Sequence, residues 1–288
     1  TNEGTHMFRS LTINRIAAVA LAAGLMTGIA SSAKASGGDT EKPTRQSWSW
    51  TGPFGTFDRA QLQRGFKVYK EVCANCHSMR LVAFRNLSDK GGPEFSVDQV
   101  KTLAATYTVK DGPNDKGEMF ERPGRPADRF PSPFPNPEAA KAALGGAPPD
   151  LSLIAKARTY ERGVLLSLVD IVTQYQEQGP DYLVALLNGY VDPPHDVKVG
   201  DGLNYNKYFP GNQLSMANPL NPGQVDYTDG TDPTVENYAK DVTAFLMWAA
   251  EPKMEDRKRI GAFFMLMMIV LAMMTYFTKK RIWSDVQH

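Results

Sequence analysis

The sequence predicts a mostly helical, exported domain held by one membrane helix near its C-terminus. Three observations carry this prediction: an N-terminal run typical of a signal peptide, several segments with apolar residues at three- and four-residue spacing, and a long uncharged run near the C-terminal end. No internal repeat or convincing alternating strand pattern accompanies them. The formal net charge of +1 gives no electrostatic reason to expect a nucleic-acid partner.

The first segment resembles a cleavable signal peptide. Two arginines, Arg9 and Arg15, precede an apolar run at 16–30, which is followed by the small-residue cleavage signature Ala33-Lys34-Ala35. The run is short and rich in Ala and Gly, which favours removal over retention as a membrane helix. We therefore expect residues 1–35 to be a leader and signal peptide, in which either Met7 is the true start or the chain is a piece of a longer precursor.

The next stretch, from Ser36 to about Asp58, is predicted to be an extended polar arm that packs over the domain surface and carries Trp48 and Trp50. A helix follows at 57–72, where Asp58 is a plausible N-cap and apolar residues recur at helical spacing.

A second helix is predicted at 96–107, because Ser96 and Gln99 match a capping box. The Pro- and Gly-rich stretches 110–137 and 192–232 are predicted to be long loops. Four further helices are predicted from their apolar faces and from residues typical of helix ends. They lie at 136–144, 151–162, 181–187 and 236–250.

The final segment is the predicted membrane anchor, residues 253–288. Residues 261–278 carry no charge and have basic clusters on both sides. About 18 residues approach the ~20 that cross a bilayer core. Because both flanks are basic, the orientation follows from the signal peptide, which leaves the tail after residue 278 in the cytoplasm.

The motif Cys73-x-x-Cys76-His77 follows the first predicted helix. Its spacing matches the covalent attachment signal of a c-type haem, in which each thiol bonds one vinyl group and the histidine is the proximal iron ligand. A redox dithiol would be expected near a βαβ pattern, and a zinc site needs further ligands for which only the remote His195 is available. The motif predicts one covalently bound haem c, with His77 on the iron.

The haem motif turns the helical prediction into a specific fold class. Residues 36–252 are expected to form a cytochrome c-like haem domain, in which a few helices and long loops surround the porphyrin. A methionine opposite the histidine would raise the reduction potential. Of the 12 methionines, position along the chain leaves Met216 and Met119 as candidates for the distal ligand, with His195 or another residue as the alternative.

Beyond the haem motif, a series of short segments resembles the cytochrome c1 family in its bacterial form, from about Trp50 to Trp283. Their order along the chain makes the resemblance specific. The segments are Ala147-Pro148-Pro149-Asp150-Leu151-Ser152 with Ala157-Arg158, Asp181-Tyr182-Leu183, Leu187-Asn188-Gly189-Tyr190, Tyr208-Phe209-Pro210-Gly211, Met216-Ala217, Lys240-Asp241-Val242, Trp248-Ala249-Ala250-Glu251-Pro252 and Arg257-Lys258-Arg259.

The resemblance implies roles for individual residues. Met216 falls on the family's distal-ligand motif, so His77 and Met216 are expected to hold the iron. Arg158 is expected to hydrogen-bond a haem propionate, as a guanidinium does with a carboxylate, although an exposed arginine at a helix end needs no such role. Tyr182 is expected to line the haem pocket. Residues 159–179 look like an insertion relative to shorter members of the family.

The resemblance also implies the function: an electron-transfer subunit of ubiquinol:cytochrome c reductase, rather than an enzyme by itself. A Rieske iron–sulfur protein, working with cytochrome b, would supply one electron, and a cytochrome c would accept it. The haem domain would lie in the periplasm, on the bacterial inner membrane and in contact with its lipid. Acidic residues could steer a basic cytochrome c; the candidates are Glu94, Asp98, Asp111, Asp115 and Glu118.

Two other functions remain open on the sequence. A free-standing anchored cytochrome that shuttles between complexes would need a flexible linker beside its anchor, whereas the helix at 236–250 runs almost directly into the span. A haem enzyme or gas sensor would need an open iron position, which a carbon monoxide spectrum would detect.

Overall fold

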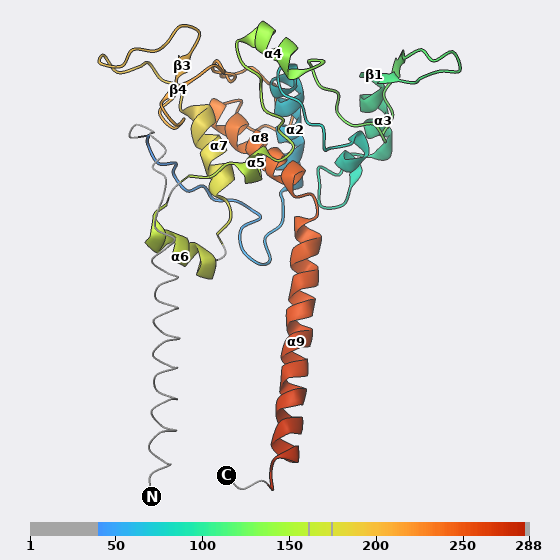
Figure 1. Ribbon diagram of the computed structural model, residues 1–288, viewed down its shortest axis with the longest axis vertical. Helices are drawn as coiled ribbons and strands as arrows, with labels where there is room; N and C mark the ends of the chain where they lie inside the picture. The colour runs from blue at the N-terminus through green and yellow to red at the C-terminus, as the bar shows by residue number, and fades with distance from the viewer. Residues whose placement is uncertain (1–39, 161, 174, 286–288) are drawn as a thin grey trace, which may run out of the picture. The chain divides into compact units, whose positions relative to one another are not determined.

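The computed structural model describes residues 40–160, 162–173 and 175–285, and the predicted signal peptide lies outside them. The described part is mostly helical, as predicted, with a few short strands (Figure 1). The helices are α2 (Arg59–Glu71), α3 (Val97–Ala105), α4 (Pro137–Leu144), α5 (Ile154–Ala157), α6 (Val164–Thr173), α7 (Gln178–Asn188), α8 (Val235–Ala250) and α9 (Met254–Ile282). Two 3-10 turns, η1 (Cys73–Asn75) and η2 (Phe84–Ser88), follow α2.

The contact between α2 and α8 forms the centre of the domain, and α5 and α7 pack against α8 (Figure 1). The two backbones approach closely because α2 carries Gly65, where an added Cβ would lie 2.0 Å from the carbonyl oxygen of Asp241. The ring centroids of Phe66 and Phe245 are 5.5 Å apart in an edge-on contact. Arg64 joins the same helices through an ion pair of 2.7 Å with Asp241.

The local signals at several helix ends are confirmed. Asp58 accepts a hydrogen bond from the backbone N–H of Gln61 at the start of α2. Ser96 and Gln99 form the expected capping box of α3. At α4, Asn136 accepts from the backbone of Ala139, and Gly145 ends the helix in the left-handed conformation.

The helix predicted at 151–162 is wrong over most of its length, since α5 covers only Ile154–Ala157. One tertiary and one local hydrogen bond replace the expected first turn. The backbone N–H of Leu151 donates to the carbonyl oxygen of Ser78 at 2.8 Å, and Asp150 accepts from the N–H of Ser152 at 2.9 Å.

The two predicted loops contain short hairpins that the sequence analysis missed. Strands β1 (Thr108–Asp111) and β2 (Phe120–Pro123) pair antiparallel, as do β3 (Asn204–Tyr205) and β4 (Gln213–Leu214). Neither strand of the first hairpin has a buried residue, and each strand of the second has two residues, too few to establish a period.

From residue 40 to 58 the N-terminal arm forms turns and irregular backbone without a helix, and its tryptophans lie deeper than a surface arm implies. The rings of Trp48 and Trp50 stack with centroids 4.5 Å apart, and both side chains are buried. The Nε1 atom of Trp48 donates to the Oδ1 atom of Asp181 at 2.9 Å. The arm therefore belongs to the core of the domain.

Helix α9 contains the predicted span within its 29 residues and is, in the part of the chain that the structure describes, the one helix long and apolar enough to cross a membrane. Only three residues separate it from α8. Its first turns are tied to the domain, because Glu255 pairs with Arg59 at 2.8 Å and Lys258 donates to the carbonyl oxygen of Gly55 at 3.2 Å. Within the described residues, a short connection thus joins a helical domain to one helix that is long and apolar enough to span a membrane.

Candidate haem site

The end of α2 brings the two cysteines and the histidine together. After the helix ends at Glu71, the turn η1 starts at Cys73, whose carbonyl oxygen accepts from the N–H groups of Cys76 at 3.1 Å and of His77 at 2.9 Å. Both thiols are free and partly buried. Burial raises the pKa of the Cys73 thiol to about 12.

The ring of His77 is held from one side. Its Nδ1 atom lies 2.8 Å from the carbonyl oxygen of Pro149. A hydrogen bond to that carbonyl requires the proton on Nδ1, so Nε2 is left with a free lone pair for a metal. Burial lowers the pKa of His77, against the opposing effects of Pro149 and Asp150, which favours the neutral ring that a metal ligand needs.

Asp150 fixes the segment that presents this carbonyl. Its carboxylate accepts from the Ser78 hydroxyl at 2.8 Å and from the N–H of Arg80 at 2.9 Å. Burial alone would raise the pKa of Asp150, but hydrogen bonds from Ser152, Arg80 and Ser78 outweigh it and hold the pKa at about 2. The loop before α5 is therefore fastened along the chain that follows His77.

The expected distal ligand Met216 and the expected pocket residues Tyr182 and Arg158 also lie near one another. Met216 follows β4 and is half-buried, and its carbonyl oxygen accepts from the Tyr190 hydroxyl at 3.0 Å. Tyr190 neighbours the buried Tyr182. Burial raises the pKa of Tyr182, and the charge of Arg158 opposes this rise, so Arg158 lies close to Tyr182. The Arg158 side chain itself is exposed.

One loop touches both groups of residues. Pro149 contacts the ring of His77, and three positions earlier an added Cβ at Gly146 would lie 2.8 Å from the Oγ atom of Ser215, next to Met216. The donor set of two free thiols, an oriented imidazole and a thioether fits a covalently attached haem with two axial ligands. The residues that this loop brings together therefore suit a covalently bound haem.

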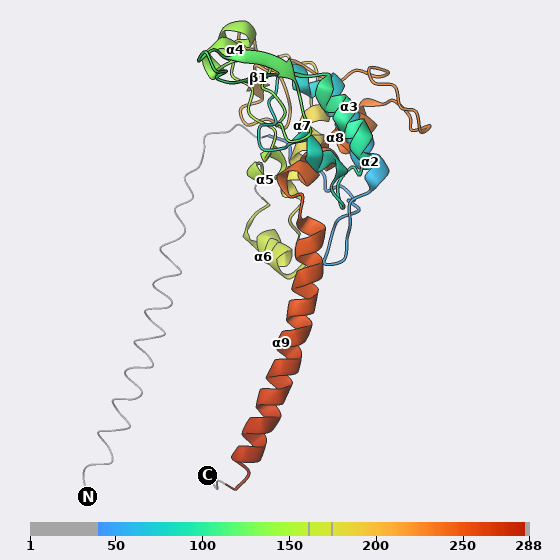
Figure 2. The ribbon, with the colours of Figure 1, turned by 90° about the vertical axis from the view of Figure 1, so that its right-hand side faces the viewer.

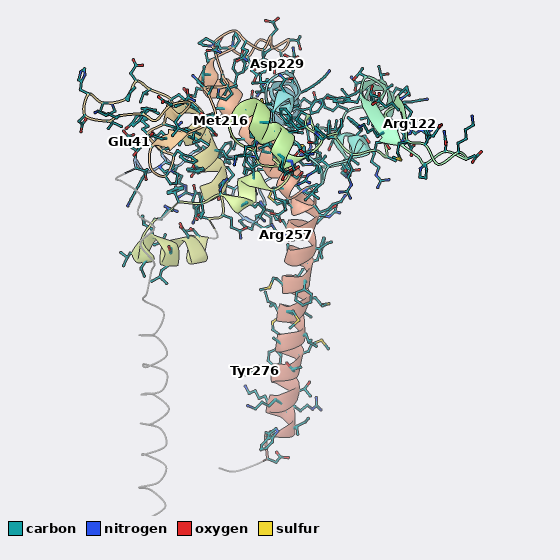
Figure 3. All side chains as sticks on the ribbon, turned by 45° about the horizontal axis from the view of Figure 1, so that its top comes forward. Glu41, Arg122, Met216, Asp229, Arg257 and Tyr276 are labelled. Atoms are coloured by element: carbon teal, nitrogen blue, oxygen red, sulfur yellow. The ribbon has the colours of Figure 1, made fainter. Side chains whose placement is uncertain are left out.

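The alternative distal candidates lie elsewhere. Met119 lies in the loop of the β1–β2 hairpin with 63% of its side chain exposed. Figure 3 shows Met216 within the main body of the domain, whereas Arg122 marks the hairpin toward the opposite side. His195 is exposed in the loop before β3.

Sequence reasoning gave Pro149 and Asp150 only a role at the start of the helix predicted at 151–162, and it assigned no role at the haem to Pro149, Asp150 or Tyr190. Pro149 and Tyr190 act on the backbone or through it, and a carbonyl contact leaves no trace in residue type. Asp150 is an acidic residue just before a predicted helix, which suggested that it caps that helix and not that it binds Ser78 and Arg80. Among the proposed steering carboxylates, Glu94 is engaged by Arg59 at 3.0 Å and Asp111 is engaged by Arg122.

The helical domain, the Cys-x-x-Cys-His turn and the single apolar helix define a membrane-anchored c-type cytochrome. Residues 48–286 match the Cytochrome C1 family. The chain belongs to this family and carries one covalently bound haem c.

Three relatives illustrate the range of the similarity. The chain is 56% identical to "Cytochrome b/c1" of Bradyrhizobium diazoefficiens over 93% of its own length, but it spans only 39% of that protein. It is 47% identical to "Cytochrome c1" of Blastochloris viridis, covering 96% of this chain and 98% of the relative. "Cytochrome c1-2, heme protein, mitochondrial" of Solanum tuberosum is 45% identical over 82% of this chain and 84% of its own.

Proposed function

We propose that this chain is the electron-transfer subunit of a ubiquinol:cytochrome c reductase, the bc1 complex. It receives one electron from a Rieske iron–sulfur protein and passes it to a cytochrome c, beside cytochrome b in the same complex. The observation that carries the proposal is the ordered Cys73–His77 turn in a chain of the Cytochrome C1 family. The chain breaks no substrate bond, so it is a redox subunit and not an enzyme by itself.

When bound, haem supplies a centre that gains and loses one electron. Cys73 and Cys76 anchor it through two thioether bonds, and His77 and Met216 ligate its iron. The Pro149 carbonyl holds the His77 ring, and the Tyr190 hydroxyl holds the Met216 backbone. Arg158 hydrogen-bonds a propionate, and Tyr182 lines the pocket; their proximity supports both roles.

The location follows from the domain order. Residues 1–35 are a leader and signal peptide, residues 36–252 are the haem domain in the periplasm, and residues 253–288 are the anchor with a cytoplasmic C-terminus. The chain thus crosses the bacterial inner membrane once, with the haem domain on the side where a cytochrome c would dock.

The connection between α8 and α9 favours a fixed subunit over a mobile shuttle. Three residues join the helices, and the ion pair between Arg59 and Glu255 holds the start of α9 against the domain. A shuttle would need a linker long enough to let the domain move between partners.

Gentle detergent purification through a tag after His288 tests the proposal. We expect b-type haem, an iron–sulfur signal and quinol-dependent cytochrome c reduction to copurify with the chain. A lone haem c protein without quinol activity, stable across several mild detergents, would contradict the proposal and favour the shuttle. Strong carbon monoxide binding by the ferrous protein would instead indicate an open iron site.

The ligand assignment has its own test. Replacing Met216 by Leu should leave the haem covalently attached but lower the midpoint potential by on the order of 100 mV, within the ~0.8 V range that axial ligands set. Met119→Leu is the matched control, because its side chain is exposed in a hairpin loop. An unchanged potential in Met216→Leu, measured by redox titration, would rule out Met216 as the ligand.

A further inference from the structure

Helix α6 presents an apolar surface to its surroundings. Val164 and Leu165 at its start are 80% and 79% exposed, and Leu168 one turn later is 57% exposed. Leu166 and Val169 are also about half exposed. Contiguous exposed apolar surface of this kind marks contact with a membrane or a partner.

The charged group of α6 is turned toward the domain. Asp170 is buried, forms an ion pair with Arg162 and accepts from the Nε2 atom of Gln178 at 3.1 Å. Ser167 and Thr173 are exposed, but their hydroxyls donate to the carbonyl oxygens of Gly163 and Val169, at 3.0 and 2.9 Å. A surface helix in water buries its apolar side and exposes its polar side, so this arrangement suits a helix whose outer surroundings are apolar.

The position of α6 identifies those surroundings. In Figures 1 and 2 it lies at the height of the first turns of α9, and in Figure 1 it runs across the direction of α9. Four residues after α6, burial raises the pKa of Glu177 and the charge of Lys258 opposes that rise, which places the two side chains near each other. Lys258 precedes the uncharged span at 261–278 by less than one turn, which is the level of lipid headgroups.

A second element presents apolar surface at the same level. Phe54 is 84% exposed and lies in the turn whose carbonyl oxygens, those of Trp50 and Gly55, bind the ammonium group of Lys258. A groove beside it continues onto the lipid-facing start of α9, where Phe263 and Leu266 line it. Apolar side chains of α6 and of the turn at Phe54 are therefore exposed at the level where the uncharged span of α9 begins.

We propose that α6 is an interfacial helix that lies in the headgroup and upper acyl region of the phospholipid bilayer beside α9. Its leucines and valines replace water contacts with lipid contacts, while its buried Asp170 keeps the helix attached to the domain. A helix of this kind lies on the membrane without crossing it. It gives the domain a second point of contact with the bilayer besides the span.

Spin-label accessibility in the assembled, haem-loaded protein tests this proposal. With both native cysteines bonded to haem, Leu165→Cys gives one reactive thiol for a nitroxide label, and Val164→Cys is a second site should the first variant fold poorly. Ala142→Cys in α4 is the matched control, because α4 lies at the end of the domain away from α9 (Figure 1). Each variant is placed in nanodiscs of phosphatidylcholine and phosphatidylglycerol, and its haem absorption spectrum reports folding.

We expect the labels on α6 to collide several times more often with oxygen, which concentrates in lipid, than with a neutral water-soluble nickel chelate. The label on α4 should show the reverse preference. Two results would overturn the proposal: α6 labels that prefer the nickel chelate, as on a water-exposed surface, or labels protected from both reagents, as under a protein partner. Neither result bears on the electron-transfer function, which depends on other residues.

Discussion

At the scale of single residues, much of the haem site is held by backbone atoms. The Pro149 carbonyl oxygen orients His77, and the Met216 carbonyl oxygen is bound by Tyr190. The sequence alone is enough to propose Cys73, Cys76 and His77 as the attachment residues, because covalent attachment fixes both residue type and spacing. Spacing alone could not choose between methionines, since a loop ligand has no period, and the contacts of Pro149 depend on tertiary folding that no local pattern encodes.

Asp150→Ala should weaken both the fold and the orientation of His77. The change leaves the hydroxyl of Ser78 and the N–H of Arg80 without their acceptor, which we expect to cost about 2 kcal/mol of unfolding free energy. The midpoint potential should also shift, because the Pro149 carbonyl loses its support. Denaturant titration and redox titration measure the two effects, and the exposed Asp192→Ala is the control. Equal stability in both variants would show that Asp150 does not hold the segment after His77 in place.

Asp181→Asn should remove one component of the pH dependence of stability. Burial raises the pKa of Asp181 above its ordinary 3.8, despite hydrogen bonds from Tyr175, Trp48 and Gln46. The folded state therefore holds this proton more tightly than the unfolded state, so the stability contributed by Asp181 falls as the pH rises from about 4 through the raised pKa.

The measurement is the free energy of unfolding of wild type minus that of Asp181→Asn, followed from pH 4 upward. We expect this difference to decrease with pH and then level off. The exposed Asp232→Asn gives the comparison for a carboxylate at the surface. A difference that rises with pH would show that the hydrogen bonds to Asp181, rather than its burial, dominate.

At the scale of elements, the strongly periodic helices α2 and α8 are where sequence and structure agree within a residue or two. Their apolar spacing and caps are local signals, and packing reinforces them. The segment before α5 differs because its backbone bonds to a distant segment, as Leu151 does to Ser78. The hairpins differ because their strands are short and carry little burial pattern. The exposed apolar side of α6 could not be predicted for a different reason. Sequence periodicity shows that a segment is an apolar helix, but not whether protein, lipid or water surrounds it.

Gly65→Ala should separate α2 from α8. The added methyl would lie 2.0 Å from the carbonyl oxygen of Asp241, and backbone atoms cannot move aside as a flexible side chain can. We expect a loss of about 3 kcal/mol in unfolding free energy, measured by denaturant titration of the haem-loaded protein. Gly261→Ala is the matched helical control, because an added Cβ there meets no atom within 4 Å. Similar stability in the two variants would contradict close contact of the helices.

At the scale of the whole molecule, the haem domain and the anchor are held together by Arg59, Glu255 and Lys258 around a three-residue connection. Arg59 donates to both carboxylate oxygens of Glu255 at 2.8 Å. Bidentate pairs of this kind are stronger than single contacts between exposed charges. The sequence predicted the short connection. It could not predict that Glu255 pairs with Arg59, because the two residues are 196 positions apart and no local pattern links them.

Arg59→Met should loosen the start of α9 without unfolding the domain. We expect trypsin to cut after Lys253, in the connection, about five times faster than in wild type, which corresponds to a loss of about 1 kcal/mol in local stability. Lys70→Met removes an exposed cation from the same helix and should leave the cleavage rate unchanged. Unchanged cleavage in Arg59→Met would show that the ion pair does not hold the connection.

The junction between the haem domain and α9 links two properties of the domain: its height above the membrane and its rotation around the axis of α9. Because α9 is a continuous helix from Met254 to Ile282, the part of it fastened to the domain and the part within the bilayer share one screw axis. Each residue of an α-helix advances about 1.5 Å and turns about 100°. One alanine inserted after Ile260 would therefore rotate the haem domain by about 100° around the axis of α9 while shifting it along that axis by only about 1.5 Å. The number of residues between the junction and the span therefore sets the direction in which the haem faces around the axis of α9.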